Sequence, residues 1–336
     1  MAVSVREVAA AASVSVGTVS NVLNNPDRVA PATVERVHEA IRRLGFVRND
    51  AARQLRAGRS RCIGLAVLDV GNPFFTDIAR AAEEHAAENQ LTVLLGTTDE
   101  SLERERLYLD TFDELRVYGM LVSPVGDDLT RLEQMQARGT PVVLVDRNGE
   151  GTPFSSVAVD DVAGGEMAVH HLAEIGRRRI AFIGGPPTLR QIRDRLDGAR
   201  GAATAHAGVT VEVIETAETD VASGRAVAER IAGIPVGRRP DAVFCANDLL
   251  ALGVVQELVL RSAAAVPQDI AVVGYDDISF AASAVVPLTS VRQPSAMIGA
   301  AAVDLLTDAV DDPGREPEHL CFQPVLVPRA STGGVG

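Results

Sequence analysis

From Arg61 onward, short apolar segments alternate with stretches that have helical spacing, and this alternation restricts the fold more than any other feature of the sequence. Segments with the length and apolar content of buried strands lie at residues 63–68, 91–95, 119–122, 142–145, 180–183, 242–244 and 270–273. Helical patterns fall between them at residues 75–89, 103–115, 164–175, 222–231 and 249–260. Strands that are apolar throughout are typical of parallel sheets covered on both faces. We therefore predict an α/β fold with parallel sheets here.

The first sixty residues instead have the pattern of short helices. Ser4 and Glu7 have the spacing of a capping box before an alanine-rich segment of high helix propensity. Ser15 can cap a second helix, Pro31 suits the first turn of a third, and Gly45 can end it. The segment is therefore predicted to be all-helical.

Two of these helices, within residues 5–24, have the length and tight connection of a helix-turn-helix, whose second helix would enter the DNA major groove. That helix begins at Ser15, and the small hydroxyl groups of Thr18 and Ser20 suit phosphate oxygens. A small three-helix bundle without any ligand has the same periodicity. The periodicity alone leaves both interpretations open.

The distribution of charge favours the DNA-binding interpretation. The whole chain has a net charge of −13, but residues 1–61 carry ten arginines and five acidic residues, a net charge of +5. The remaining 275 residues carry 22 arginines and 40 acidic residues, a net charge of −18. A basic segment attached to a large acidic body is typical of a DNA-contacting module joined to a domain with another task.

Polar residues stand where several predicted strands end. They are Asp146, Asn247, Asp248, Asp276 and Asp277, while Arg193 and Arg195 follow the turn at residues 184–186. Carboxylates, an amide and a guanidinium that converge on a cleft can bind the vicinal hydroxyls of a sugar. Each residue could instead be a loop cap; Asp248, for example, could cap the helix at residues 249–260.

Several protein classes are disfavoured. Cys62, Cys245 and Cys321 are far apart and form no C-x-x-C pair, so neither a disulfide framework nor a zinc site is indicated. The N-terminal residues lack the apolar segment of a signal peptide, and no stretch approaches the roughly 20 apolar residues of a membrane span. His170 and His171 have no acidic partner at metal-ligand spacing. We expect a cytoplasmic protein without a bound metal or cofactor.

Longer motifs identify a family resemblance. The segment V-R-E-V-A-A-A-A-S-V-S-V-G-T-V-S-N-V-L-N-N at residues 5–25 and the pattern V-x-x-x-T-x-E-R-V-x-x-A-I-R-R-L-G-F at residues 29–46 closely resemble the DNA-binding headpiece of the LacI/GalR (lactose-repressor) family. The segment N-D-A-A-R-Q-L at residues 49–55 resembles the hinge of that family, and Ile63-Gly64-Leu65 resembles the start of its sensor domain. The resemblance extends over nearly the whole chain.

The resemblance implies an architecture. An all-α headpiece would occupy residues 1–47, a hinge helix and linker residues 48–60, and a type I periplasmic-binding-protein-like sensor of two parallel-sheet subdomains residues 61–330. The chain would cross between the subdomains three times, with the N-subdomain at about 61–158 and 292–321 and the C-subdomain at about 159–291 and 322–330. We expect the tail at residues 331–336 to be disordered.

The resemblance also implies roles for residues that contact DNA. Val16 and Gly17 match the positions that vary operator preference, Asn21 matches another position near the bases, and Leu55 matches the hinge leucine that wedges into the minor groove. The further candidates are Ser4, Ser15, Thr18, Ser20, Asn24, Asn49, Ala52, Arg53 and Arg56.

Four positions depart from the family pattern. Asn21 replaces a usual arginine, Gly17 offers no side chain, Ser13 replaces a common turn glycine, and Arg48 replaces a frequent proline. Direct readout of bases by this helix is therefore expected to be weaker or shifted.

In the sensor, the resemblance points to an effector site. The candidates are Asn72, Phe74, Asp146, Arg193, Arg195, Asn247, Asp276 and Gln293. Phe74 could stack on the apolar face of a sugar, and Tyr275 could do the same or belong to the core. Asp160 is expected to have a structural role at the subdomain boundary.

These expectations combine into one functional hypothesis. The chain would be a homodimeric transcriptional regulator, most simply a repressor, that binds an approximately palindromic operator and responds to a small effector. A sugar inducer is favoured, and a purine-like corepressor is the alternative. A solute-binding protein would need a signal peptide, and an enzyme would need a catalytic motif, neither of which the sequence contains.

Overall fold

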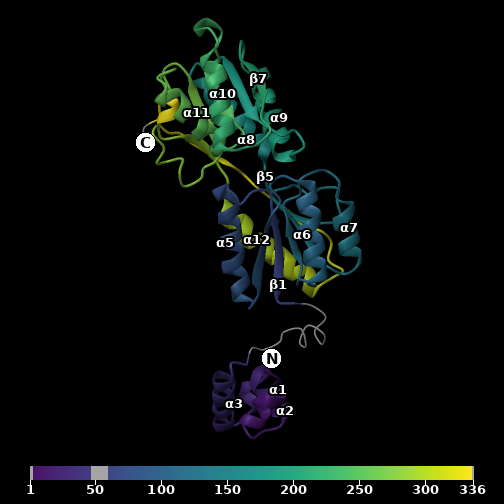
Figure 1. Ribbon diagram of the computed structural model, residues 1–336. Coiled ribbons are helices and arrows are strands. Elements are labelled where there is room, and N and C mark those ends of the chain that lie inside the picture. Colours follow the sequence, from purple (N-terminus) through teal and green to yellow (C-terminus); the bar gives the residue numbers. More distant parts are fainter. Residues whose placement is uncertain (1–2, 47–59, 335–336) are drawn as a thin grey trace. The chain divides into compact units, whose positions relative to one another are not determined.

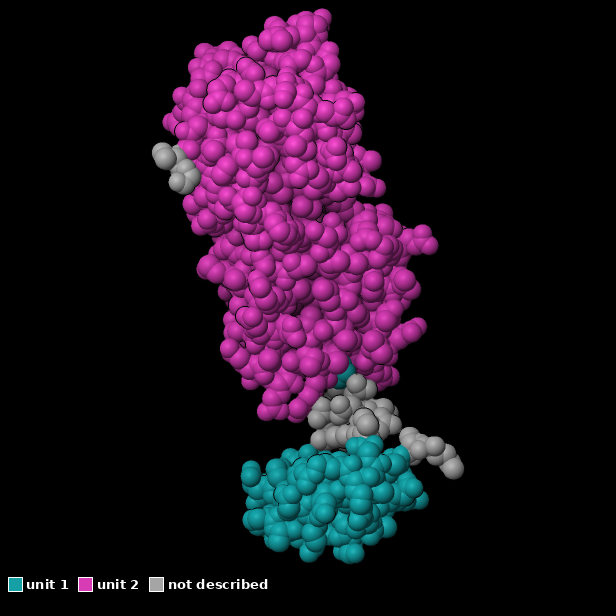
Figure 2. All heavy atoms as spheres, turned by 60° about the vertical axis from the view of Figure 1, so that its left-hand side comes forward, with its two compact units in different colours: residues 1–60 teal, residues 61–336 magenta. Residues whose placement is uncertain are grey.

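A computed structural model describes residues 3–46 and 60–334 of the chain. The chain divides into two compact units, residues 1–60 and residues 61–336 (Figure 2). We describe each unit by itself.

Within residues 3–46, the first unit is a bundle of three helices, as predicted. Its helices are α1 (Val5–Ala11), α2 (Val16–Asn24) and α3 (Pro31–Leu44), with the 3₁₀ turn η1 (Pro26–Arg28) before α3. The capping box of Ser4 and Glu7 is present, the Ser15 side chain caps α2, and Gly45 ends α3 with a φ of +63°. A small apolar core holds the helices together, with Val8, Val19 and Val37 fully buried. The predicted capping residues therefore stand at the starts of α1 and α2 and at the end of α3.

The second unit contains two six-stranded sheets, each flanked by helices (Figure 1). The first sheet has the order β11-β5-β4-β3-β1-β2 and is parallel throughout. Its strands are β1 (Cys62–Val67), β2 (Thr92–Thr97), β3 (Met120–Val122), β4 (Val142–Val145), β5 (Ser155–Val159) and β11 (His319–Phe322). Helices α6 (Leu102–Glu114) and α7 (Thr130–Ala137) pack on one face, and α5 (Pro73–Glu88) and α12 (Ser295–Asp311) on the other. We call this sheet and its helices the first lobe.

The second sheet has the order β12-β10-β9-β8-β6-β7 and is parallel except for β12, which runs antiparallel to β10. Its strands are β6 (Arg179–Gly184), β7 (Thr210–Glu215), β8 (Ala242–Cys245), β9 (Ala271–Asp276), β10 (Thr289–Arg292) and β12 (Val325–Val327). The helices are α8 (Asp161–Glu174), α9 (Arg190–Ala205), α10 (Val221–Ala232) and α11 (Asp248–Leu260), with 3₁₀ turns η2 (Val236–Arg238) and η3 (Ala330–Thr332). We call this sheet and its helices the second lobe.

The chain passes between the lobes three times. It enters the second lobe after β5, returns to the first between β10 and α12, and crosses again between β11 and β12. At the first crossing Asp160 caps α8, since its side chain accepts a hydrogen bond from the Ala163 amide at 2.9 Å. The predicted fold class, a helical headpiece with a two-lobed α/β sensor, is confirmed.

Helices α8 and α9 approach each other closely because glycines stand at the contact. A Cβ atom on Gly198 would lie 1.9 Å from the backbone oxygen of Val162, and one on Gly165 would lie 2.0 Å from the backbone oxygen of Arg195. Neither helix could keep its position with a larger residue there. This contact places residues 162–165 of α8 beside residues 195–198 of α9, and Arg195 becomes important at the site described below.

Two sequence expectations about local structure are wrong. The segment expected to be a buried strand at residues 91–95 forms β2, an edge strand whose Leu94 and Leu95 are 37% and 45% exposed. The tail expected to be disordered begins with η3, where Ser331 and Thr332 are buried. The Ser331 hydroxyl donates to the Val272 carbonyl oxygen at 2.6 Å and accepts from the Thr289 amide at 2.8 Å. A contact with a distant strand, invisible in the local sequence, orders this segment.

No helix in the described ranges is long and apolar enough to cross a membrane.

Candidate DNA-binding surface and effector cleft

Helix α2 presents part of its first turn to solvent, where a recognition helix must contact bases. Val16 is 42% exposed, and Gly17 and Asn21 are exposed as well. Val19 and Val22 face the core of the first unit and hold the helix in place. Three of the candidate residues are therefore available on one surface, which is consistent with the helix-turn-helix prediction.

Several of the remaining headpiece candidates form local hydrogen bonds. The Ser15 hydroxyl accepts from the Thr18 amide at 3.0 Å and lies 2.9 Å from the Thr18 hydroxyl. The Asn24 side chain donates to the backbone and side-chain oxygens of Ser20, at 2.7 and 3.2 Å. Ser4 is bound to Glu7 within the capping box. Besides any contact with DNA, these residues stabilise the ends of α1 and α2.

The turn before α2 contains Ser13, one of the four departures from the family pattern, in a backbone conformation that is unfavourable for serine. Ser13 has a φ of +53°, in the left-handed region that favours glycine. The family resemblance indicated a glycine here, and the backbone conformation supplies the physical reason.

The hinge candidates Asn49, Ala52, Arg53, Leu55 and Arg56 lie outside the described residues. Their roles stay predictions.

In the second unit, a cavity of about 40 Å³ lies between the two lobes. Its walls come from the carboxyl ends of strands in both sheets, including the residues that follow β1, β4 and β8 and the last residue of β9. The predicted residues that line it are Asn72, Phe74, Asp146, Arg195, Asn247 and Asp276. Carboxyl ends of parallel strands are the usual place for ligand sites in α/β folds.

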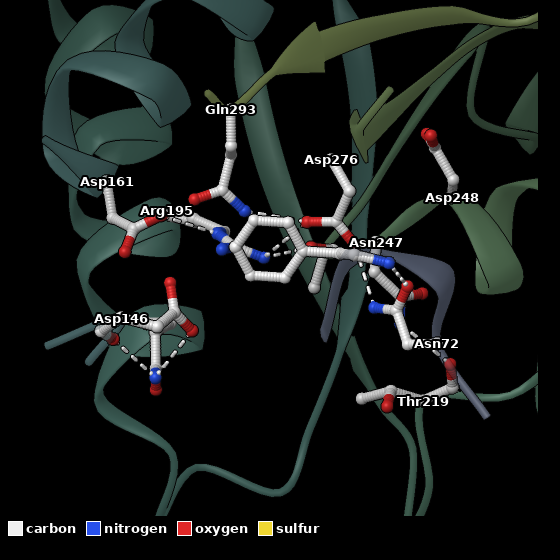
Figure 3. A network of polar contacts seen from close by, with 12 residues as sticks. Asn72, Asp146, Asp161, Arg195, Thr219, Asn247, Asp248, Asp276 and Gln293 are labelled. Carbon is white, nitrogen blue, oxygen red and sulfur yellow. Dashed lines mark hydrogen bonds and ion pairs between the residues drawn. The ribbon is translucent and has the colours of Figure 1, made fainter. Parts of the chain in front are cut away.

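Arg195 occupies the centre of the polar network of the cavity (Figure 3). Its Nε atom donates to Oδ1 of Asp161 at 2.8 Å, and its Nη1 atom donates to the Ala246 carbonyl oxygen at 2.6 Å. Nη1 also lies 3.9 Å from Oδ1 of Asp276. Burial alone would lower the pKa of Arg195, but Asp161 and the neighbouring acidic groups outweigh it and raise that pKa. The guanidinium is therefore charged and fixed in orientation.

Tyr275 lies beneath this guanidinium. Its ring centroid is 3.7 Å from the guanidinium carbon of Arg195, and the residue is fully buried. Tyr275 therefore belongs to the core and packs against Arg195. Of the two roles expected for it, stacking on a sugar or a place in the core, the packing shows the second.

Asp276 connects the two lobes. Its Oδ2 atom accepts a hydrogen bond from Nδ2 of Asn72 at 2.8 Å, and its Oδ1 atom accepts one from Nε2 of Gln293 at 2.8 Å. Burial raises the pKa of Asp276 to about 6, although Arg195 and the two amides lower it. The backbone φ of +102° is unusual for a non-glycine residue, and such conformations cluster at functional sites.

Asp146 lies opposite, at the end of β4. Nε2 of Gln191 donates to its backbone oxygen at 2.7 Å and to its Oδ2 atom at 3.0 Å. Burial raises the pKa of Asp146 well above the usual value, and the nearby negative charge of Asp161 raises it further. Its φ is +57°, and its Oδ1 atom is buried without a hydrogen-bond partner among the described residues. This carboxyl group can therefore accept or donate one further hydrogen bond.

Two predicted effector residues do not line the cavity. Arg193 instead donates from Nη2 to Oδ2 of Asp127 at 2.7 Å, which is a contact between the lobes outside the cavity. Gln293 is buried behind Asp276 and holds that carboxylate. On α9, consecutive side chains point in different directions, and two arginines two residues apart cannot face the same space.

The role suggested for Asp248 as a helix cap is wrong. The cap of α11 is Asn247, whose side chain accepts from the Leu250 amide at 2.9 Å. Asp248 is fully buried and binds the Ser290 hydroxyl at 2.7 Å and the Ile278 amide at 2.8 Å. Asn247 thus caps α11 and also lines the cavity.

The sequence interpretation missed other residues at the cavity, namely Asp69, Phe75, Glu100, Gln191, Ile192 and Thr219, and it missed Asp161 beneath Arg195. Phe75 follows the Phe74 that was chosen. Asp161 begins the helix after the first crossing, so a search of helix starts at the crossings would have included it. Gln191, Glu100 and Thr219 stand in loops or first turns with no distinguishing local pattern.

No group of three or more His, Cys, Asp and Glu side chains that could hold a metal ion occurs within the described residues. No disulfide joins the three cysteines, all of which lie in the described ranges. The Nε2 atom of His170 lies 3.1 Å from Oε1 of Glu174, four residues along α8, so the expectation that His170 has no acidic partner at such a spacing is wrong. His170 also lies 2.8 Å from His206, and His171 lies 2.9 Å from the Thr332 hydroxyl.

A helical headpiece with an exposed second helix, joined to a two-lobed α/β unit with a polar cleft, defines the class of DNA-binding regulators that have a ligand sensor. Comparisons with known proteins agree. Residues 4–49 match the family of bacterial regulatory proteins of the lacI type, and residues 169–332 match the periplasmic binding protein-like domain.

Relatives and solved structures extend the match to the full length. The HTH-type transcriptional repressor PurR of Aliivibrio fischeri (strain MJ11) is 32% identical over 330 residues, 97% of each chain. The ribose operon repressor of Bacillus subtilis (strain 168) is 36% identical over 303 residues, 90% of each chain. The Lac repressor dimer bound to operator and the anti-inducer ONPF superimposes with a TM-score of 0.85 at 26% identity, over 99% of each chain.

The chain belongs to the LacI family of bacterial regulatory proteins. The resemblance identified from the headpiece motifs is thereby confirmed, together with the prediction of a DNA-binding transcriptional regulator that has a ligand-binding sensor domain.

Proposed function

We propose that this protein is a homodimeric repressor that binds an approximately palindromic operator and releases it when a sugar enters the cleft between the lobes. One observation carries the proposal. Three side chains chosen as effector ligands from the sequence, Asn72, Asp146 and Asp276, take part in hydrogen bonds that join the lobes. Asn72 donates to Asp276, and Gln191 donates to Asp146. A ligand that hydrogen-bonds to these groups must change the contacts between the lobes.

The chemistry of the cavity favours a sugar over a purine. Carboxylates of Asp146 and Asp276 accept hydrogen bonds from hydroxyl groups, and the fixed guanidinium of Arg195 donates them. Phe74 and Phe75 provide apolar surface beside these groups. A purine-like corepressor, which would strengthen operator binding instead of weakening it, is the second candidate.

Dimerisation and operator binding follow from the relatives. The Lac repressor structure with which the chain superimposes is a dimer on its operator. A two-fold dimer presents two recognition helices to two half-sites, so the operator of this protein should have two-fold symmetry.

The test measures operator binding with and without ligand. The operator is first selected from random duplex DNA with the full-length protein, and its dissociation constant is then measured by fluorescence anisotropy against neutral sugars and purines. A coupling free energy of about 1–3 kcal/mol corresponds to a change of roughly 5- to 150-fold in the dissociation constant. A sugar is expected to raise that constant, whereas a purine that lowers it would reverse the proposed sign.

Two variants localise the effect. Asp276→Asn is expected to lose the response to ligand, because the carboxylate charge opposite Arg195 is removed. Glu229→Gln removes a carboxylate exposed on α10 and is expected to respond like the unmodified protein. An unchanged response in Asp276→Asn would remove the cleft from the mechanism.

A further inference from the structure

The cleft opens into a wider depression whose walls are almost entirely acidic. This depression, which we call the mouth, has a volume of about 310 Å³ and is lined by Asp69, Asp99, Glu100, Glu218, Thr219 and Asp220. The first three residues come from the first lobe and the last three from the second. Asp99 forms an ion pair with Arg104, but none of the described residues that form the wall is basic.

The mouth and the inner cavity are adjacent parts of one site, because Asp69, Glu100 and Thr219 line both. The hydroxyl group of Thr219, in the second lobe, donates to Oε1 of Glu100, in the first lobe, at 3.0 Å and joins the two lobes. A monosaccharide in the inner cavity would therefore border the mouth. The volume of the mouth reaches the lower end of the range of about 300–1,000 Å³ found for small-molecule sites.

The inner cavity adds to the excess of negative charge. Asp146 and Asp276 line it, and Arg195, the one cation among the described residues that line it, is already paired with Asp161 at 2.8 Å. Asp146 is only 2% exposed, and its Oδ1 atom has no hydrogen-bond partner in the part of the chain described (Figure 3). A buried acceptor without a partner is costly, and a donor group on a ligand would remove that cost.

The mutual repulsion of these carboxylates is visible at Glu100. Burial raises the pKa of this group to about 7, and Asp69, Glu218 and Asp99 each contribute to the increase although Thr219 lowers it. An anionic ligand such as a sugar phosphate would add to this repulsion, whereas a cationic ligand would relieve it.

The geometry separates two kinds of cation. A metal ion needs at least three ligands close enough to surround it, and no such group of His, Cys, Asp or Glu side chains occurs in the described ranges. An organic ammonium group needs only nearby acceptors and can hydrogen-bond to carboxylates that stand on different lobes.

We propose that the effector is a polyhydroxylated amine of the amino-sugar class, with its hydroxyl groups in the inner cavity and its ammonium group among Glu100, Glu218 and Asp220 in the mouth. The inference rests on the proposed function of the cleft and specifies the charge of its ligand. Closure of the lobes over the ammonium group would bring carboxylates from both lobes to one positive charge.

The experiment compares matched ligands on the full-length protein. D-glucose, D-glucosamine, N-acetyl-D-glucosamine and D-glucose 6-phosphate, and the corresponding galactose series, are titrated by calorimetry at low salt, with thermal melting as a second readout. The amine is expected to bind about tenfold more tightly than the neutral sugar of at least one series. Acetylation should remove the gain, added salt should reduce it, and the phosphate should bind more weakly than the parent sugar.

Two variants assign the gain to the mouth. The double variant Glu218→Gln with Asp220→Asn is expected to lose the preference for the amine and to keep operator binding, since asparagine can still cap α10 as Asp220 does. Glu229→Gln, which removes one carboxylate elsewhere on α10, should keep the preference.

The outcomes distinguish this inference from the proposed function. If no amine stabilises or binds the protein above its neutral counterpart, the inference is overturned, and neutral sugars that release the operator would still support the proposed function. If Ca²⁺ or Mg²⁺ alone produces the stabilisation and the double variant removes it, the mouth is a metal site and the inference is also overturned. If the amine binds as expected without changing operator affinity, the ligand class is supported and the proposed regulation fails.

Discussion

Replacement of Arg195 by methionine tests the central claim about the cleft, that one buried cation holds several buried carboxylates together. Methionine keeps most of the aliphatic volume of the side chain but removes the charge. Asp161, which binds Nε of Arg195 at 2.8 Å, and Asp276, 3.9 Å from Nη1, would then be buried without a counter-charge. Removal of one partner from a buried ion pair costs about 3–5 kcal/mol. We expect a loss of unfolding free energy of that size at pH 7.5.

The loss should shrink as the pH falls. Even with Arg195 present, the folded-state pKa of Asp276 is about 6, above its ordinary value of 3.8. A group with a raised folded-state pKa binds more protons in the folded state between the two values, so stability increases as the pH decreases through that window. Without Arg195 this pKa rises further and the window widens. The difference between variant and unmodified protein is therefore expected to be smaller at pH 5 than at pH 7.5.

Urea unfolding at both pH values measures this difference. Far-UV circular dichroism is the suitable signal because the chain contains no tryptophan. Arg193→Met is the matched control, since that side chain is 36% exposed and its pair with Asp127 is a surface ion pair worth about 1 kcal/mol or less. Adding Asp161→Asn to Arg195→Met should recover part of the loss, as expected for interacting residues. A loss below about 1 kcal/mol, or one that does not change with pH, would refute the reasoning.

Three further results are expected. Gly198→Ala should destabilise the protein by about 2–4 kcal/mol in the same urea assay, because its Cβ atom would meet the Val162 backbone oxygen. Gly201→Ala, where the nearest atom is 3.5 Å away, should be neutral or slightly stabilising. Equal effects of the two substitutions would contradict the packing argument. Glu100→Gln should raise the melting temperature at pH 8 more than at pH 5, since the raised pKa of about 7 makes ionisation of Glu100 unfavourable in the folded state. An increase in melting temperature that is the same at both pH values would contradict this reasoning. Leu55→Ala should weaken binding to the selected operator by at least about tenfold, as measured by anisotropy, with a much smaller effect on random DNA; equal losses would remove the minor-groove wedge.

The sequence was most informative where the signal is local or periodic. The apolar alternation after Arg61 predicted the α/β class, because parallel strands covered on both faces must be apolar along their whole length. Ser15 and Gly45 marked helix ends correctly, because a cap needs only a suitable side chain or a permitted φ at one position. The headpiece motif added the family, which later comparisons confirmed.

The choice of cleft residues was partly within reach of the sequence. Residues within two positions of the ends of parallel strands, such as Asp146 and Asn247, could be chosen because those strand ends meet at one edge of each sheet. The same rule could not separate Arg195 from Arg193, since their directions depend on how α9 lies against α8. It also gave no sign of Gln191 or Glu100, which reach the site from other elements.

Tertiary structure decided which groups meet across the lobes. Asn72 and Asp276 are 204 residues apart in the chain, and the hydrogen bond between them exists only because two separately folded sheets face each other. The order of Ser331 and the burial of Asp248 arise in the same way, from strands distant in sequence. The periodicity of apolar residues indicates which face of a helix or strand is buried. Tertiary packing decides which residues of other elements contact that face. The sequence by itself therefore determined the elements, the class and the family, whereas the charge and hydrogen bonding of the cleft were decided by the tertiary fold.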